Sequence, residues 1–441
     1  MPCLTGTRSI GIPTTPSTST GDIAGDVAQD VGLPVIIIGS GCTGLAIAQG
    51  LKKAGIPAII FEKNAAVFSL GERDWNTGLH WALQSVQVDP NTSTKPIDTL
   101  AFLNGATGEV MNAPEIPTFH RLRRSKLRNL LSKDLDIRWN KRLKDMVFEH
   151  DGRNVTAVFE DGEYITGRLV IGADGARSTV RSILLGPDIA ASTRLPYSAT
   201  FVQAKFASEQ ALFLRSFHPL YIAAPHPDGY FAFFGLQDAP EVDNPEDWTF
   251  FFYISWNSSI EQQDEERKTF GNNERLAQVK EKSKGYCEPW KSAFEWVPED
   301  QAAWYFDLTV WDPSLAEHKW DNKNGRVTLT GDAAHPMTYQ RGQGLNHSIT
   351  DAGRLVGSLT TAALSRVSAI EKYEAEMKAR AGEEVRLSVM NTTMLHDWTK
   401  VLESPVMRSG FKQEQIKRTN GFDIDHLCVH IPGEMSSWIT K

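Results

Sequence analysis

The chain has 441 residues, of which 41% are hydrophobic and 23% are charged, and its formal net charge is −8. That length exceeds what one hydrophobic core usually serves, so two domains are expected, and the negative charge argues against a nucleic-acid-binding surface. No apolar run reaches the ~18 residues that would span a bilayer, so no transmembrane segment is expected.

The cysteines are scattered along the chain, without C-x-x-C spacing and without histidine partners. This pattern argues against a metal site and against a disulfide framework. We therefore expect no metal, and a reducing compartment, the cytoplasm, as the location. The four cysteines are Cys3, Cys42, Cys287 and Cys428.

Residues 1–30 are rich in serine, threonine, glycine and proline. Such a composition cannot bury a core, so a disordered tail is predicted. A transit peptide would be rich in arginine and poor in acids. This stretch has a single arginine, Arg8, and three aspartates, Asp22, Asp26 and Asp30, so a tail is favoured over a targeting segment.

A glycine-rich turn follows the apolar run 34–38, which reads as a buried strand. Gly39, Gly41 and Gly44 have the G-x-G-x-x-G spacing: the first permits a tight turn, the second lets a pyrophosphate approach, and the third lets a helix pack against the strand. A helical pattern and a second apolar run follow, and the run ends in Glu62, where an acid can accept hydrogen bonds from a ribose. The pattern predicts a dinucleotide-binding βαβ unit, with a plain α/β crossover as the alternative.

Two later segments have two possible interpretations each. Residues 71–81 mix aromatic and charged side chains, and they form either a loop that lines a cofactor or a surface loop. Residues 120–131 place an arginine cluster at the start of a predicted helix, where cations are disfavoured. An anionic ligand nearby would explain the cluster, and a solvated basic face is the alternative.

Strand signals dominate the next part of the chain. Asp-Gly turns within 146–166 predict a β-meander, and a short buried strand then ends in Asp174 and Gly175. From 186 to 320 the strand-like runs are aromatic and predict a mostly antiparallel sheet with a helix over 274–284. Those aromatic residues either form ordinary core or line an apolar ligand pocket.

A buried-strand pattern returns at 326–330 and ends in Gly331 and Asp332. Gly342 and Gly344 follow, and then an amphipathic helix. Ser368 and the acid three residues later form a capping box that predicts a charged helix to about residue 391.

The three glycine turns, in this order and spacing, resemble those of the single-component FAD-dependent monooxygenases, the flavin-dependent aromatic hydroxylases with a para-hydroxybenzoate-hydroxylase-like fold. The stretch 331–337 followed by 342–344 is the most specific element. The resemblance covers about 32–400 and is greatest to fungal secondary-metabolite members. It implies an α/β fold (α+β overall), in which a Rossmann-like FAD-binding domain carries an inserted, mostly antiparallel substrate sheet. The expected parts are the tail 1–30, the FAD-binding domain 31–185 and 321–400, the substrate domain 186–320 and a C-terminal segment 401–441.

The resemblance also implies a cofactor site. The turn of Gly39, Gly41 and Gly44 would hold the FAD pyrophosphate, and Glu62 would hold the adenosine ribose. Its neighbour Lys63 and the more distant Arg124 are expected among the cofactor-binding residues, Arg124 as the family arginine that contacts FAD. Asp174 and Gly175 would serve FAD and the approach of NAD(P)H, and Asp332 would bind the ribitol chain. The pyrimidine edge of the flavin would meet Gly344, Leu345 and Asn346.

Some residues depart from the family pattern. Arg128 stands where many relatives carry glutamine, and many have a proline where Thr338 or Tyr339 stands. His335 belongs to the motif but is expected to be structural. No residue matches a family-wide catalytic acid or base, so the catalytic residues stay unknown.

The implied activity is insertion of one oxygen atom, by hydroxylation or epoxidation, into an apolar aromatic or polycyclic small molecule, with NAD(P)H and O2 as co-substrates and a role in secondary metabolism. The alternatives are a flavin-dependent oxidase or dehydrogenase on the same fold, and a non-enzymatic flavin-binding protein. The sequence does not give the oligomeric state.

Overall fold

The computed structural model describes residues 32–65, 76–79, 86–87, 99–114, 120–150, 152–218, 221–241, 243–409 and 429–430. The chain divides into a unit Met1–Leu33 and a unit Pro34–Lys441, and everything below concerns the second unit. The predicted tail lies outside the described residues, as does the stretch 71–81 apart from its central strand. Among the residues described, no helix is both long and apolar enough to cross a membrane.

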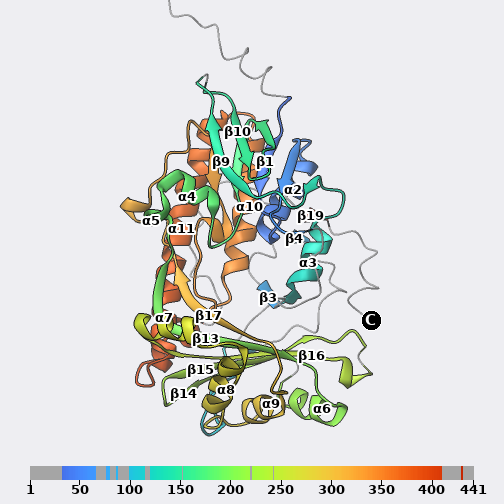
Figure 1. The fold of residues 1–441 in the computed structure, drawn as a ribbon, viewed down its shortest axis with the longest axis vertical. Coiled ribbons are helices and arrows are strands. Elements are labelled where there is room, and N and C mark those ends of the chain that lie inside the picture. Colours follow the sequence, from blue (N-terminus) through green and yellow to red (C-terminus); the bar gives the residue numbers. More distant parts are fainter. Residues whose placement is uncertain are drawn as a thin grey trace, which may run out of the picture. The chain divides into compact units, whose positions relative to one another are not determined.

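A five-stranded parallel sheet forms the first layer, with the strand order β18-β12-β1-β2-β8. Figure 1 labels its middle strand, β1. Most of its residues are buried, as expected for a parallel sheet that is covered on both faces. The strands predicted at each glycine turn are therefore confirmed. The bounds are β1 Val35–Ile38, β2 Ala58–Phe61, β8 Ile137–Arg138, β12 Leu169–Gly172 and β18 Val327–Leu329.

Long helices accompany this sheet: α2 Cys42–Lys53, α10 Gly344–Thr360 and α11 Arg366–Leu395. Helices α2 and α10 approach closely at Gly50, where an added Cβ would lie 3.0 Å from Val356 Cγ2. The predicted start of α11 is wrong by a few residues. Its N-cap is Ser365, whose Oγ accepts the backbone N–H of Ser368. Ser368, the predicted N-cap, therefore lies inside the first turn of the helix.

The predicted meander is confirmed as an antiparallel sheet, β9 Leu143–Phe148, β10 Val155–Phe159 and β11 Tyr164–Gly167. It packs against the parallel sheet, since Phe61 of β2 stacks on Phe159 of β10 with ring centroids 4.5 Å apart. Short elements complete this part of the chain: α3 Arg124–Leu131, α4 Thr179–Leu185, α5 Pro187–Ala190, and the strand pairs β3 Asn76–Leu79 with β7 His120–Arg123 and β4 Val86–Gln87 with β19 Val429–His430.

The second large sheet has seven strands in the order β17-β13-β16-β15-β14-β5-β6, all antiparallel except for the pair β14 and β5. This confirms the mostly antiparallel sheet. The bounds are β5 Phe102–Leu103, β6 Val110–Asn112, β13 Thr193–Ala204, β14 Tyr221–His226, β15 Tyr230–Asp238, β16 Thr249–Asn257 and β17 Ala303–Val310. The accompanying helices are α6 Ser208–Ser216, α7 Ile260–Thr269, α8 Asn272–Ser283, α9 Trp290–Trp296 and α12 Pro405–Ser409.

Alternation along these strands gives the sheet two different apolar faces. Phe250 and Phe252 belong to one face, which packs against α8 and α9, for example through Phe294. Phe251 and Tyr253 belong to the other face, which contacts residues near the end of α11. The domain limits at residues 185 and 320 stay a prediction.

Candidate cofactor and substrate site

The three glycine turns meet at one edge of the parallel sheet. β1, β12 and β18 are neighbours, so the turns that follow them lie side by side. An added Cβ on Gly39 would lie 2.4 Å from the carbonyl oxygen of Ala173, and one on Gly331 would lie 2.6 Å from Thr43 Oγ1. In open α/β sheets this edge is where ligands bind.

The glycines of the site fall into two groups. Gly39 has φ +106°, and an added Cβ on Gly44 would lie 2.1 Å from the Gly39 carbonyl oxygen, so these two positions need glycine for the turn itself. Among the described residues, the nearest atom to an added Cβ on Gly41 is 4.0 Å away, and no atom lies within 4 Å of an added Cβ on Gly175 or Gly344. The space next to these last three backbones is therefore free for a ligand.

Glu62 lies directly beside the first turn. Its Oε2 accepts hydrogen bonds from the Ser40 N–H at 2.9 Å and the Ser40 hydroxyl at 2.8 Å, and its Oε1 accepts from the Asn64 N–H at 3.0 Å. Burial alone would raise the pKa of Glu62, but these hydrogen bonds hold it below its ordinary value. A carboxylate offers about four acceptor positions, so this one can still accept hydrogen bonds from a ligand. Lys63 beside it is exposed.

The arginines of α3 reach the same turn. Arg128 donates through Nε to the Ser40 carbonyl at 3.0 Å and through Nη2 to the Ser40 hydroxyl at 3.2 Å. Burial raises the pKa of the Cys42 thiol, and the charges of Arg124 and Arg128 oppose that rise. Both arginines are half-buried. The basic start of α3 therefore lies against the glycine turn, which favours the anionic-ligand interpretation over a solvated face.

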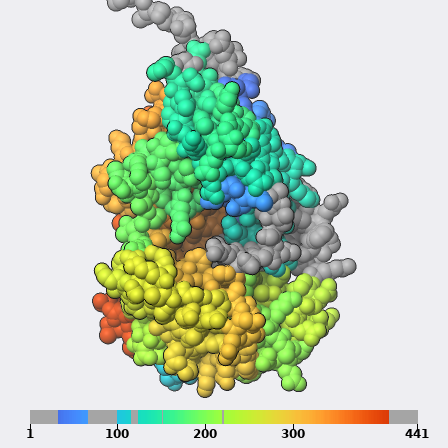
Figure 2. All heavy atoms as spheres, viewed as in Figure 1, coloured from blue at the N-terminus to red at the C-terminus, as the bar shows by residue number. Residues whose placement is uncertain are grey.

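The two aspartates of the later turns differ in their surroundings. Asp174 lies against the start of α4, whose N-cap is Ser178: its carboxylate accepts from the Ser178 hydroxyl at 2.5 Å and the Thr179 N–H at 2.6 Å. Asp332 is exposed to solvent, yet enough protein surrounds it for desolvation to raise its pKa, against the charges of His335, Arg124 and Arg181. Figure 2 shows a recess between the green and yellow parts of the chain, with orange-coloured residues at its base.

Helix α10 begins at Gly344, with Gln343 as its N-cap and without a side-chain cap in the part of the chain described. Leu345 and Asn346 lie in its first turn, where backbone N–H groups and the helix dipole favour a negative charge. The Asn346 side chain donates to the Gly342 carbonyl at 3.1 Å, which stabilises the turn before the helix. The structure thus brings this helix start and the Gly331 turn to the same region, because Gly331 also approaches Ser348.

A buried ionic cluster supports the third turn. Asp351 Oδ2 accepts the Gly331 N–H at 2.8 Å and lies 2.7 Å from His335 Nε2, while its Oδ1 accepts from Arg380 Nη2 at 2.6 Å. Arg380 also lies 2.8 Å from His347 Nδ1. His335 is fully buried in this cluster, in agreement with its expected structural role.

The segment between the third turn and α10 reaches the seven-stranded sheet. The Tyr339 ring packs edge-on against Phe201 at 5.2 Å and Tyr253 at 5.1 Å between centroids. Thr392 of α11 donates to Gln340 Oε1 at 2.9 Å, and its hydroxyl lies 2.8 Å from that of Thr338. The aromatic face of the sheet therefore lies beside the residues that lead to α10.

A family model described as FAD binding domain matches residues 118–388. The FAD-dependent monooxygenase cctM of Talaromyces islandicus is 38% identical over 400 residues, which are 86% of this chain and 97% of that protein. The chain belongs to the FAD-dependent monooxygenases. The monooxygenase phnB of Penicillium herquei is 36% identical over 86% of this chain and 94% of its own length. A further model, described as lycopene cyclase protein, matches residues 34–197 and does not reach the third turn.

Solved structures support the fold of this monooxygenase. A 2,6-dihydroxypyridine-3-hydroxylase from Arthrobacter nicotinovorans has a TM-score of 0.67 at 17% identity, covering 91% of this chain and 97% of that one. Klebsiella pneumoniae HpxO complexed with FAD and uric acid has a TM-score of 0.65 at 19% identity, covering 85% and 92%. The mixed α/β fold class is thereby confirmed.

Sequence reasoning missed two residues that hold the site of the monooxygenase together. Ser40, inside the G-x-G spacing, links Glu62 to Arg128. The buried Arg181 joins the second and third turns by donating to the carbonyls of Ala176 at 2.6 Å and Ala333 at 2.8 Å. The sequence around Arg181 carries no local signal of its burial, because its partner Ala333 belongs to a turn 152 residues away.

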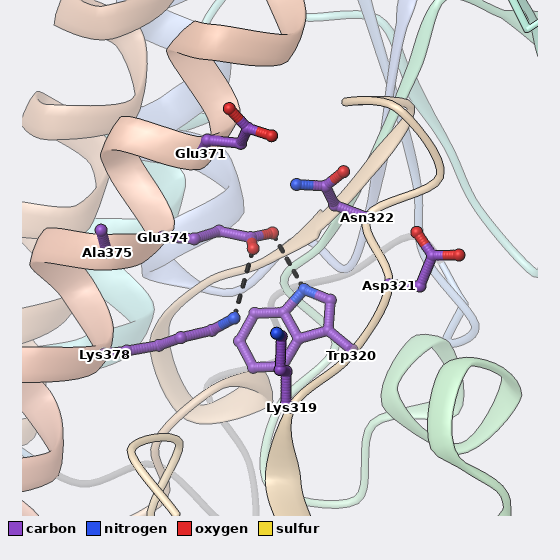
Figure 3. Close-up of a pocket in the computed structure, with 8 residues that line it drawn as sticks. All are labelled: Lys319, Trp320, Asp321, Asn322, Glu371, Glu374, Ala375 and Lys378. Atoms are coloured by element: carbon purple, nitrogen blue, oxygen red, sulfur yellow. Dashed lines mark hydrogen bonds and ion pairs between the residues drawn. The ribbon is translucent and has the colours of Figure 1, made fainter. Parts of the chain in front are cut away.

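A separate pocket lies between α11 and the segment 319–322 (Figure 3). Glu374 accepts from Trp320 Nε1 and from Thr328 Oγ1, both at 2.9 Å, and the Lys378 ammonium lies 3.5 Å from the Trp320 ring centroid. These groups satisfy one another and share no residue with the glycine turns. We therefore interpret the pocket as a structural feature.

Stability of this monooxygenase is expected to fall in mild acid because of His396. The ring is buried, lies 2.9 Å from Ser255 Oγ and 2.7 Å from the Thr392 carbonyl, and burial lowers its pKa to about 4. The unfolded chain, with a pKa of about 6.5, binds the extra proton, so stability is fully present above pH ~6.5 and falls towards pH 4. At pH 5 the loss from this group is about 2 kcal/mol.

Urea unfolding at pH 7.5 and pH 5 measures the effect. His396→Gln should reduce the difference between the two pH values, while His150→Gln, at an exposed position, should leave it unchanged. An unaltered difference in the His396 variant would contradict the assignment.

Proposed function

We propose that this monooxygenase inserts one oxygen atom, by hydroxylation or epoxidation, into an apolar aromatic or polycyclic small molecule of secondary metabolism, with electrons from NAD(P)H. The observation that carries the proposal is the aromatic face formed by Phe201, Phe251 and Tyr253, which meets Tyr339 of the segment leading to α10. An apolar face beside the cofactor site suits an apolar substrate.

The first turn would hold the FAD pyrophosphate through Gly39, Gly41 and Gly44. The open space beside Gly41 and the start of α2 next to it support this role. Glu62 would accept hydrogen bonds from the adenosine ribose, with Lys63 beside it.

The remaining cofactor contacts would come from the later turns and α3. Arg124 would neutralise part of the phosphate charge, as its influence on Cys42 and Asp332 supports. The exposed carboxylate of Asp332 would bind the ribitol chain. The turn of Asp174 and Gly175, open beside the glycine, would serve FAD and the approach of NAD(P)H. Gly344, Leu345 and Asn346 would meet the flavin pyrimidine edge.

FAD, when bound, supplies the redox and oxygen chemistry, which no amino-acid side chain can perform. The chain's own residues would position and protect the reacting groups. The N-terminus of α10 at Gly344 would favour negative charge on the pyrimidine edge. The aromatic face around Phe201 and Tyr253 would exclude water from the substrate side.

The cytoplasm is our proposed location for this enzyme. Cys42 and Cys287, both within the described residues, are unpaired thiols, which is the usual state in a reducing compartment.

Labelled dioxygen tests the chemistry. Aromatic compounds are first screened for those that accelerate NAD(P)H oxidation by the purified holoenzyme, and the product of the best one is analysed after incubation under ¹⁸O2. One labelled oxygen atom in the product is expected, and an anaerobic incubation should give none. A product that has lost two hydrogens, with all the oxygen recovered as peroxide, would show a flavin oxidase instead.

A further inference from the structure

The face of the seven-stranded sheet that meets Tyr339 is ordered in rows across the strands. The register between β13 and β16 pairs Gln203 with Phe251, Phe201 with Tyr253, and Ala199 with Ser255. Adjacent rows on one face are about 7 Å apart, because they are separated by two residues along each strand. Gln203 and Ser255 thus place polar groups on opposite sides of the aromatic row formed by Phe201 and Tyr253.

The Ser255 end of this face is filled by protein. The Tyr339 ring covers the middle row, and its buried hydroxyl has no hydrogen-bond partner among the described residues. The Ser255 hydroxyl lies 2.9 Å from His396 Nε2. His396 in turn packs against Tyr197 at 4.8 Å between ring centroids. Towards the other end of this face, Gln203 and Phe233 are half-buried, so this is the part of the face that a ligand would meet.

The Gln203 amide has an unmet hydrogen-bonding need. Its Nε2 is buried, and among the residues that the structure describes no acceptor lies within hydrogen-bonding distance. The rest of the side chain is half-buried, and its neighbours on this face, Phe201 and Phe251, are apolar. A buried amide without a partner costs free energy, and a ligand acceptor would recover that cost.

We propose that Gln203 is a specificity-determining residue that donates a hydrogen bond to an oxygen acceptor, a carbonyl or phenolic oxygen, on the edge of a flat aromatic substrate. This assignment rests on the proposed function, because it places the substrate on the aromatic face. A ligand with an oxygen at that edge satisfies the amide, while a ligand of the same shape without it leaves Nε2 unpaired. Such a difference is how a site with a buried polar group discriminates between substrates.

Two flat tricyclic probes of nearly the same shape test the proposal without turnover. 9-Fluorenone carries a carbonyl acceptor, and fluorene lacks it. Their affinities for the oxidised holoenzyme are measured from the change in the FAD absorbance spectrum. We expect the wild-type protein to bind fluorenone about 2- to 10-fold more tightly than fluorene, as one neutral hydrogen bond implies.

Gln203→Leu keeps the size of the side chain and removes the donor, so this preference should vanish while fluorene binding stays the same or improves. Thr200→Val is the matched control. Thr200 lies on the same strand as Gln203, but its side chain belongs to the opposite face of the sheet. Its hydroxyl is also buried and has no hydrogen bond among the described residues, so the substitution removes a comparable polar atom. This control should keep the wild-type preference.

Three results would overturn the assignment: an unchanged preference in Gln203→Leu, an equal loss in Thr200→Val, or wild-type protein that does not prefer fluorenone. The flavin chemistry is followed separately. If both variants retain FAD, a negative binding result refutes the role of Gln203 alone. Failure of wild-type protein to consume NAD(P)H would refute the proposed function instead.

Discussion

Gly41→Ala is expected to leave the fold intact and to weaken FAD binding by roughly 5- to 150-fold, which corresponds to about 1–3 kcal/mol of steric overlap. Gly41 has φ −68° and ψ 173°, which alanine adopts without strain, and the nearest atom to an added Cβ is 4.0 Å away. The new methyl group would therefore meet only the ligand. FAD titration of the apoprotein, followed by flavin fluorescence, measures the loss.

Gly44→Ala is the matched comparison within the same motif. Its methyl group would lie 2.1 Å from the carbonyl oxygen of Gly39, so the turn itself must move. We expect a less stable protein that is isolated without FAD. Equal thermal stability of the two variants, or FAD affinity in Gly41→Ala equal to that of the wild type, would show that the cofactor lies elsewhere.

Asp351→Ala is expected to lower the free energy of unfolding by about 3–5 kcal/mol, because it leaves the buried charge of Arg380 without its main partner. The same substitution removes the acceptor of the Gly331 N–H and the contact with His335. Since Gly331 belongs to the third turn, weaker FAD binding should accompany the lost stability. Urea unfolding of the purified protein gives the first quantity, and the FAD titration gives the second.

Glu371→Ala, on the exposed side of α11, is the control for a lost carboxylate. It should change the free energy of unfolding by less than about 0.5 kcal/mol. If Asp351→Ala behaves like this control, the buried cluster does not support the third turn.

Local patterns in the sequence predicted most of the elements near the site. The apolar runs before Gly39 and Gly331 are short and bounded by glycine, so only a buried strand suits them. Asp-Gly turns predicted the meander, since these residues readily adopt the conformations that hairpins need. The start of α11 was misplaced because both Ser365 and Ser368 are good N-caps, and the sequence does not show which one the chain uses.

The positions of the site residues, unlike the local elements, depend mainly on contacts between distant parts of the chain. Glu62 and Arg128 both bind Ser40, although they are 22 and 88 residues away from it. The spacing after the first glycine turn predicted Glu62, and the resemblance predicted Arg124, but neither pointed to Ser40. A hydrogen bond across such separations depends on which strands and helices become neighbours.

The sequence by itself determined the three glycine turns, the strands that precede them and the aromatic character of the second sheet, because backbone sterics and hydrophobic periodicity act over a few residues. Only the tertiary structure decided that β1, β12 and β18 lie side by side, so that their turns form one site. It also decided that Arg181 joins two of these turns and that Gln203 lies opposite Phe251 of the neighbouring strand. These outcomes follow from strand order and register, which the whole core selects and which no single stretch of sequence encodes.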